Sequence, residues 1–185
     1  DEGREMVQIP AGPFTMGSND GDPDEAPERQ VFLKGFFIDR NEVTQDEYLR
    51  FAKMTKRAFP RIEVFEDDQS KVLKPEVAAM SVSWDDAVAY CKWAGKRLPT
   101  EAEWEKAARG VDGNEYPWGN RFDPRRCNSL EGGVGGTTPV GEYSPQGDSS
   151  FGAADMAGNV WEWTRSLQRD YPYRLDDGRE SDDVI

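Results

Sequence analysis

Gly152-Ala153-Ala154-Asp155-Met156-Ala157-Gly158-Asn159-Val160-Trp161-Glu162-Trp163-Thr164 is the stretch that says most about the fold. It combines small residues, two carboxylates, an amide and two tryptophans. Strand-like alternation over its last five residues places Val160 and Glu162 on one face and Trp161 and Trp163 on the other. This pattern predicts an extended segment in which Glu162 is more than a spare surface charge.

Four oxygen donors in this stretch are suited to a hard cation such as calcium. They are the carboxylates of Asp155 and Glu162 and the backbone carbonyls of Gly158 and Val160. The alternative is a tryptophan-rich core turn in which Asp155 caps the local backbone. Spacing alone leaves both interpretations open.

Length and composition indicate one domain with a real core, because the chain has 185 residues with 6 Trp, 9 Phe and 6 Tyr. Its 18 Gly and 12 Pro favour turns and long ordered loops over a helical bundle. No apolar run is long enough to span a membrane. The net charge of −13 argues against a nucleic-acid partner, which needs a basic surface.

The chain contains no histidine, which argues against zinc hydrolases, Ser-His-Asp enzymes and facial-triad iron enzymes. Its two cysteines are too few for a disulfide framework. We interpret Cys91 as a small buried residue on a predicted helix. Cys127 follows Arg125 and Arg126, which makes a lowered thiol pKa conceivable, although an incidental loop cysteine fits better.

Local patterns predict two strand regions and three helices, followed by a long loop. Residues 6–18 indicate a first strand and turn, and residues 30–39 a second strand. Each helix begins at a hydroxyl residue with an acidic residue three positions later, and two of the helices end at a glycine. The pairs are Thr44 with Glu47, Ser83 with Asp86 and Thr100 with Glu103, and the glycines are Gly95 and Gly110. Residues 112–152 are predicted to be loop-rich.

Several motifs in the same order resemble the formylglycine-generating enzymes, also called sulfatase-modifying factors. The resemblance covers nearly the whole chain. The motifs are Phe36-Phe37-Ile38-Asp39, Glu42-Val43-Thr44, Val82-Ser83-Trp84-Asp85-Asp86-Ala87, residues 93–105 (WAGKRLPTEAEWE), Pro117-Trp118-Gly119-Asn120 and Gly158-Asn159-Val160-Trp161-Glu162-Trp163-Thr164.

The resemblance implies an α+β fold of the C-type-lectin-like kind, with short antiparallel strands, two or three helices and long ion-stabilised loops. Residues 1–185 would form a single domain that lacks its C-terminal part. In the family, the positions of Asp155, Gly158, Val160 and Glu162 coordinate calcium. A second family calcium site begins at the positions of Asn128 and Ser129, but the loop that completes it is shortened here to the glycine run 132–136.

The activity that the resemblance implies is oxidation of a sulfatase cysteine to formylglycine, using oxygen and copper. The two thiolates that hold copper lie in the C-terminal part of the family, after a Gly-Gly-Ser strand, and neither maps onto this sequence. Cys91 and Cys127 match other positions. We therefore expect copper only where those further cysteines are present, and we expect this chain alone to be inactive.

Two functions remain open at the level of sequence. One is the oxidase, acting on a sulfatase-like protein or peptide with cysteines supplied from elsewhere. The other is a non-catalytic, calcium-stabilised binding or scaffold module that recognises a protein partner. A domain without its returning strands would also expose apolar faces that a second segment, a second chain or an oligomer covers. Five residues report on this exposure: Phe32, Phe36, Phe37, Cys91 and Trp93.

Overall fold

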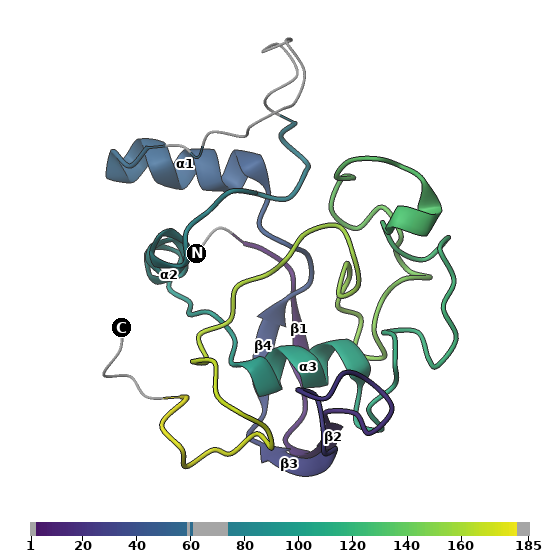
Figure 1. Ribbon diagram of the computed structural model, residues 1–185. Helices are drawn as coiled ribbons and strands as arrows, with labels where there is room; N and C mark the ends of the chain where they lie inside the picture. Colours follow the sequence, from purple (N-terminus) through teal and green to yellow (C-terminus); the bar gives the residue numbers. More distant parts are fainter. Residues whose placement is uncertain (1–2, 59, 61–73, 181–185) are drawn as a thin grey trace.

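The computed structural model describes residues 3–58, 60 and 74–180, and within them it shows the expected α+β arrangement (Figure 1). Short antiparallel strands come first, three helices follow, and most of the remaining chain is ordered loop. The strands are β1 (Met6–Ile9), β2 (Gly12–Met16), β3 (Arg29–Leu33) and β4 (Phe36–Asp39), and the helices are α1 (Gln45–Thr55), α2 (Trp84–Trp93), α3 (Glu101–Arg109) and the short 3₁₀ helix η2 (Leu130–Gly132).

The four strands form one long hairpin with a break in the middle. β1 pairs with β4, from Met6 opposite Asp39 to Ile9 opposite Phe36. β2 pairs with β3 from Gly12 opposite Leu33 to Met16 opposite Arg29. This pairing continues the register of β1 and β4, so the two pairs of strands belong to one hairpin. The break is held by α3, whose buried Lys106 donates from Nζ to the carbonyls of Pro10 at 2.8 Å and Gly12 at 3.0 Å.

The three predicted helix starts are confirmed. Thr44 and Thr100 form complete capping boxes with Glu47 and Glu103, so the first backbone N–H groups of α1 and α3 are satisfied by side chains. Ser83 caps α2 by accepting from the backbone N–H of Asp86. The predicted stops are also present, since Gly110 caps the end of α3 and Gly95 follows Ala94, the residue that caps α2, and both glycines have positive φ angles.

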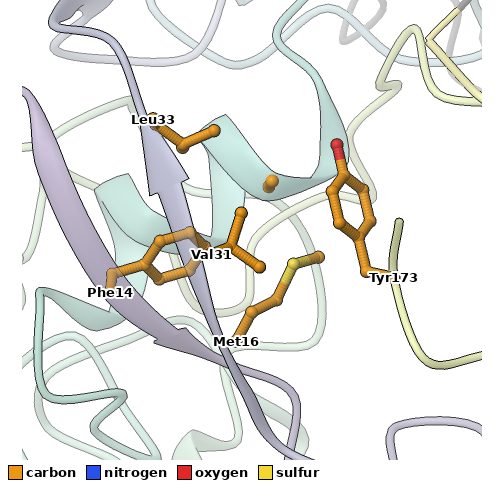
Figure 2. Close-up of a cluster of buried hydrophobic side chains, with 6 residues drawn as sticks. Phe14, Met16, Val31, Leu33 and Tyr173 are labelled. Carbon is orange, nitrogen blue, oxygen red and sulfur yellow. The ribbon is translucent and has the colours of Figure 1, made fainter. Parts of the chain in front are cut away.

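Alternation along β2 and β3 builds one part of the core. Phe14 and Met16 of β2 and Val31 and Leu33 of β3 point inward and pack against Tyr173 and α3, as Figure 2 shows. A second cluster joins Ile9 to α3 and to Ala153 and Met156. A third, aromatic cluster lies between α1 and α2 and contains Tyr48, Phe51 and Tyr90, with Trp93 packed against it.

The prediction of strand-like structure at residues 160–164 is wrong, because these residues adopt no strand. The chain there is an irregular segment that is not paired with any described strand. The long loop after Gly110 is confirmed, interrupted only by η2. In the described part of the chain, no helix is long and apolar enough to cross a membrane.

Candidate ion-binding loop and apolar cavity

An open cavity of about 1050 Å³ lies between β4, α2 and the segment 154–163. Its walls are mainly apolar, and Phe36, Phe37 and Cys91 line it together with Trp161 and Trp163. Because large apolar surfaces are rarely left to solvent on a monomer, this cavity is the leading candidate for contact with another molecule.

Trp161 and Trp163, the two tryptophans of the segment 152–164, line this cavity and are not packed in the core. Trp161 is fully exposed, at 103%, and Trp163 is half exposed, at 51%. Trp163 is anchored at its polar end, since Nε1 donates to the carbonyl of Val82 at 2.9 Å. Two of the other four tryptophans, Trp93 and Trp104, pack against core clusters. All four are half-buried and do not line the cavity: Trp84, Trp93, Trp104 and Trp118.

The five residues chosen to report on exposed apolar faces divide into two groups. Phe32 and Phe37 are 62% and 61% exposed. Phe36, Cys91 and Trp93 are half-buried. The expected apolar surface is therefore present, and what covers it stays a prediction.

Asn159 is the centre of the hydrogen bonds that shape the predicted ion loop. Its Oδ1 accepts from Asn128 Nδ2 and from the backbone N–H of Thr138, both at 3.0 Å. Its Nδ2 donates to Glu42 Oε2 at 2.7 Å, and its backbone N–H donates to the carbonyl of Asn128 at 3.0 Å. Gly158 and Val160, whose carbonyls are predicted to bind the ion, directly flank Asn159 in the sequence.

The loop has an unusual backbone. Asp155 and Asn159 adopt positive φ angles of 55° and 59°, in the left-handed region that non-glycine residues seldom occupy. Gly158, at 84°, pairs with Asn128 as a short parallel bridge. Backbone conformations of this kind are rare outside glycine and cluster at binding and active sites, which ordinary strand geometry does not explain.

Glu42 is a site residue that sequence reasoning missed. It is only 9% exposed, and its Oε1 has no hydrogen-bond partner among the described residues. Burial, followed by repulsion from Glu162 and Asp155, raises the pKa of Glu42 to about 8, although the hydrogen bond from Asn159 opposes this. The sequence shows only that Glu42 lies between a predicted strand and a predicted helix, in Asn41-Glu42-Val43-Thr44. No neighbouring residue indicates that its side chain bonds with Asn159.

The two predicted carboxylate ligands lie close enough to influence each other. Asp155 Oδ2 accepts from the backbone N–H of Gly141 at 2.5 Å, and burial raises the pKa of Asp155. Glu162 is exposed and lines the cavity; desolvation and then the charge of Asp155 raise its pKa to about 7, and the side chain of Trp104 opposes this. A nearby cation would favour the charged form of both carboxylates.

The donor set fits calcium only if the backbone takes part. In the described ranges, no three His, Cys, Asp or Glu side chains form a metal-binding group by themselves. Two carboxylates and two carbonyls are an all-oxygen set, which suits a hard cation and does not suit copper or zinc.

The second predicted set, Asn128 and Ser129, lies beside the first. Asn128 uses its Nδ2 to bond the carbonyl of Gly136 at 2.8 Å, in addition to Asn159. Ser129 Oγ is buried without a hydrogen-bond partner in the described structure. The structure thus joins Asn128 to the loop of Gly158 and Asn159.

The two cysteines are free and lie in different surroundings. Cys91 is half-buried in the cavity wall, where burial and the neighbouring Asp39 raise the pKa of its thiol to about 11. Burial also raises the pKa of Cys127, opposite to the lowering that Arg125 and Arg126 made conceivable. A pair of thiolates for copper does not fit these two residues.

Comparisons with known proteins find related sequences and a solved structure with a similar fold. Residues 1–183 match the family profile described as "Sulfatase-modifying factor enzyme 1-like domain". The chain is 38% identical to the inactive C-alpha-formylglycine-generating enzyme 2 of Bos taurus, over 87% of this chain and 70% of the relative. It is 37% identical to the formylglycine-generating enzyme of Thermomonospora curvata, over 85% of this chain and 70% of that enzyme. The solved structure of PvdO from Pseudomonas aeruginosa is similar with a TM-score of 0.74 and 30% identity, covering 91% of this chain and 72% of that chain.

Proposed function

The chain belongs to the sulfatase-modifying factor enzyme 1-like family, and from this membership we propose that it supplies the scaffold and substrate-facing cavity of a formylglycine-generating protein. In this proposal, the copper-binding thiolates come from outside residues 1–185. The partner is a protein or peptide carrying the cysteine to be modified, as in a sulfatase. The observation that carries the proposal is the apolar cavity bordered by Trp161, Trp163 and Cys91.

The cavity is suited to a peptide for two reasons. Its exposed indoles and Phe37 offer large apolar contact at little cost in side-chain entropy. Its lining also carries both signs of charge, including Arg97 and Asp39, which gives it polar as well as apolar character.

We further propose that calcium stabilises the loop through Asp155, Gly158, Val160 and Glu162. The support is the all-oxygen donor set, the raised pKa values of both carboxylates and the left-handed backbone of the loop that carries them. Calcium would supply positive charge where Glu162 and Asp155 repel the buried carboxylate of Glu42.

Copper-dependent chemistry is not assigned to residues of this chain. Copper(I) selects soft thiolate ligands, and a single thiolate makes a poor site. With no histidine, and with thiols whose pKa values are raised, residues 1–185 offer no copper-binding pair. Oxidation of a substrate cysteine would therefore depend on cysteines supplied by a further segment of polypeptide.

A second candidate function is a non-catalytic binding module of the same fold. It is favoured by the 38% identity to a relative whose name describes it as inactive. In that case, the same cavity recognises a protein partner without modifying it.

One experiment tests the proposed function in two stages. A labelled Cys-X-Pro-X-Arg peptide is titrated with the protein, and the mixture is then analysed by mass spectrometry after exposure to copper and oxygen. We expect saturable binding and no aldehyde. Trp161→Ala should abolish binding, whereas Trp118→Ala, outside the cavity, should not. Aldehyde formation by this chain would show that it holds functional thiols, and absence of binding would remove the peptide from the proposal and leave the protein-binding module.

A further inference from the structure

We propose that Glu42 is a positioning residue of the calcium loop, acting through Asn159 on the carbonyls of Gly158 and Val160. This inference rests on the proposed calcium site and adds a residue to it. Glu42 lies 117 positions before Asn159 in the chain, and their side chains meet at 2.7 Å.

Glu42 can act as a fixed support because its own backbone is held. Arg4 Nη2 donates to the carbonyl of Asn41 at 2.6 Å and to that of Glu42 at 3.0 Å. The Arg4 side chain is itself 9% exposed and pairs with Asp39 at 3.2 Å and with Glu47 at 2.6 Å. Through Arg4, the backbone of Glu42 is therefore linked to the end of β4 and to the first turn of α1.

Asn159 connects Glu42 to the loop through the hydrogen bonds of its side chain. With its amide bonded on one side to Glu42 and on the other to Asn128 and Thr138, the side chain has little freedom left. The backbone N–H of Val160 also faces the Glu42 carboxylate and favours its charged form. A left-handed residue held at both its side chain and its backbone determines where its neighbours' carbonyls point.

The unpaired oxygen of Glu42 indicates that this arrangement serves a ligand. Glu42 is nine-tenths buried and one of its carboxylate oxygens has no hydrogen-bond partner among the described residues. Such an oxygen lowers the stability of the folded protein unless a bound ligand or another interaction compensates for the lost hydration. Outer carboxylates that orient metal ligands are a common device, and their loss typically weakens metal binding about 10–100-fold.

The test is calcium titration by calorimetry after removal of metal with a chelator. Glu42→Ala and Asn159→Gly should each raise the Kd at least about tenfold. Glycine is chosen at Asn159 because it accepts the positive φ angle without strain. If the two residues act as one unit, the double variant should be no more than about twofold weaker than either single variant.

Glu42→Gln separates positioning from direct binding. Glutamine still offers an oxygen to Asn159 Nδ2, so the Kd should stay within about threefold of the wild-type value. Glu105→Ala is the matched control, since Glu105 is also a largely enclosed carboxylate, accepting from the Gly17 N–H at 2.8 Å and pairing with Arg109, away from the loop. It should lower the melting temperature and leave the Kd unchanged.

Three results would overturn the inference while the calcium site stands. They are an unchanged Kd in Asn159→Gly, additive losses in the double variant, or a loss in Glu42→Gln as large as in Glu42→Ala. If Glu42→Ala does not fold, Asn159→Gly and Glu42→Gln decide the question. A wild-type chain that binds no calcium would instead remove the proposed calcium site and the inference together.

Discussion

Gly158 lies so close to Asn128 that a methyl group at Gly158 would overlap the carbonyl oxygen of Asn128. That carbonyl already accepts from the Asn159 N–H, so it cannot move aside without breaking a loop hydrogen bond. The position demands glycine for two reasons, its φ angle of 84° and the space available.

Gly158→Ala should therefore destabilise the protein more than its backbone angle alone explains. The left-handed angle costs about 1–2 kcal/mol for alanine, and the overlap adds roughly 1–3 kcal/mol. Gly178→Ala is the matched control, because Gly178 has a φ angle of 83° and no neighbouring atom within 4 Å. Equal losses in urea unfolding would contradict the close contact.

Calcium should stabilise the protein through the loop carboxylates. A ligand present at about 100 times its Kd adds about 2.7 kcal/mol, which corresponds to roughly 5–10 °C for a chain of this size. Glu162→Gln should remove most of the rise in melting temperature, because it replaces a charged ligand with a neutral one. A melting temperature that does not respond to calcium in the wild-type chain would refute the site.

The metal-free protein should lose stability as pH rises from about 5 to 8. The pKa of Glu42 is about 8 in the folded protein and 4.5 ordinarily, so the folded state binds the extra proton across this window. The stabilising contribution is complete below the ordinary pKa and is lost as pH rises through the folded value. Glu42→Gln should flatten the dependence of the urea midpoint on pH measured in chelator. A wild-type slope equal to that of the variant would be evidence against this assignment.

Cys91 should report whether another molecule fills the cavity. Its thiol lies in the wall and reacts slowly at neutral pH because its pKa is raised to about 11. Alkylation at pH 9, followed by peptide mass spectrometry, should modify Cys91 before Cys127, which is 5% exposed. A peptide, chain segment or second copy that occupies the cavity should slow the reaction of Cys91 alone. Equal protection of both thiols would indicate a general change in stability.

The helix starts could be predicted because their signals are local. A hydroxyl residue and a glutamate three positions apart satisfy the first backbone N–H groups of a helix wherever it packs, and Thr44 and Thr100 do so. The strand regions 6–18 and 30–39 could also be predicted locally, but each contains two strands, and their pairing depends on contacts between distant residues.

The segment around Trp161 could not be predicted in this way. Alternation of Val160, Trp161 and Glu162 indicates a strand only if another strand supplies hydrogen bonds, and none of the described strands lies against it. Glu42 was missed for a related reason, since its role depends on Asn159, far away in the sequence. Local patterns identify where a residue sits and do not identify its distant partners.

The broken hairpin constrains how the family can change in length. β1–β4 and β2–β3 share one register, so a residue gained or lost between β1 and β2 would turn the inward side chains of one arm outward. An equal change between β3 and β4 would restore the pairing. Insertions at these two breaks should therefore occur together in evolution, whereas the segment joining β2 to β3 can lengthen or shorten independently.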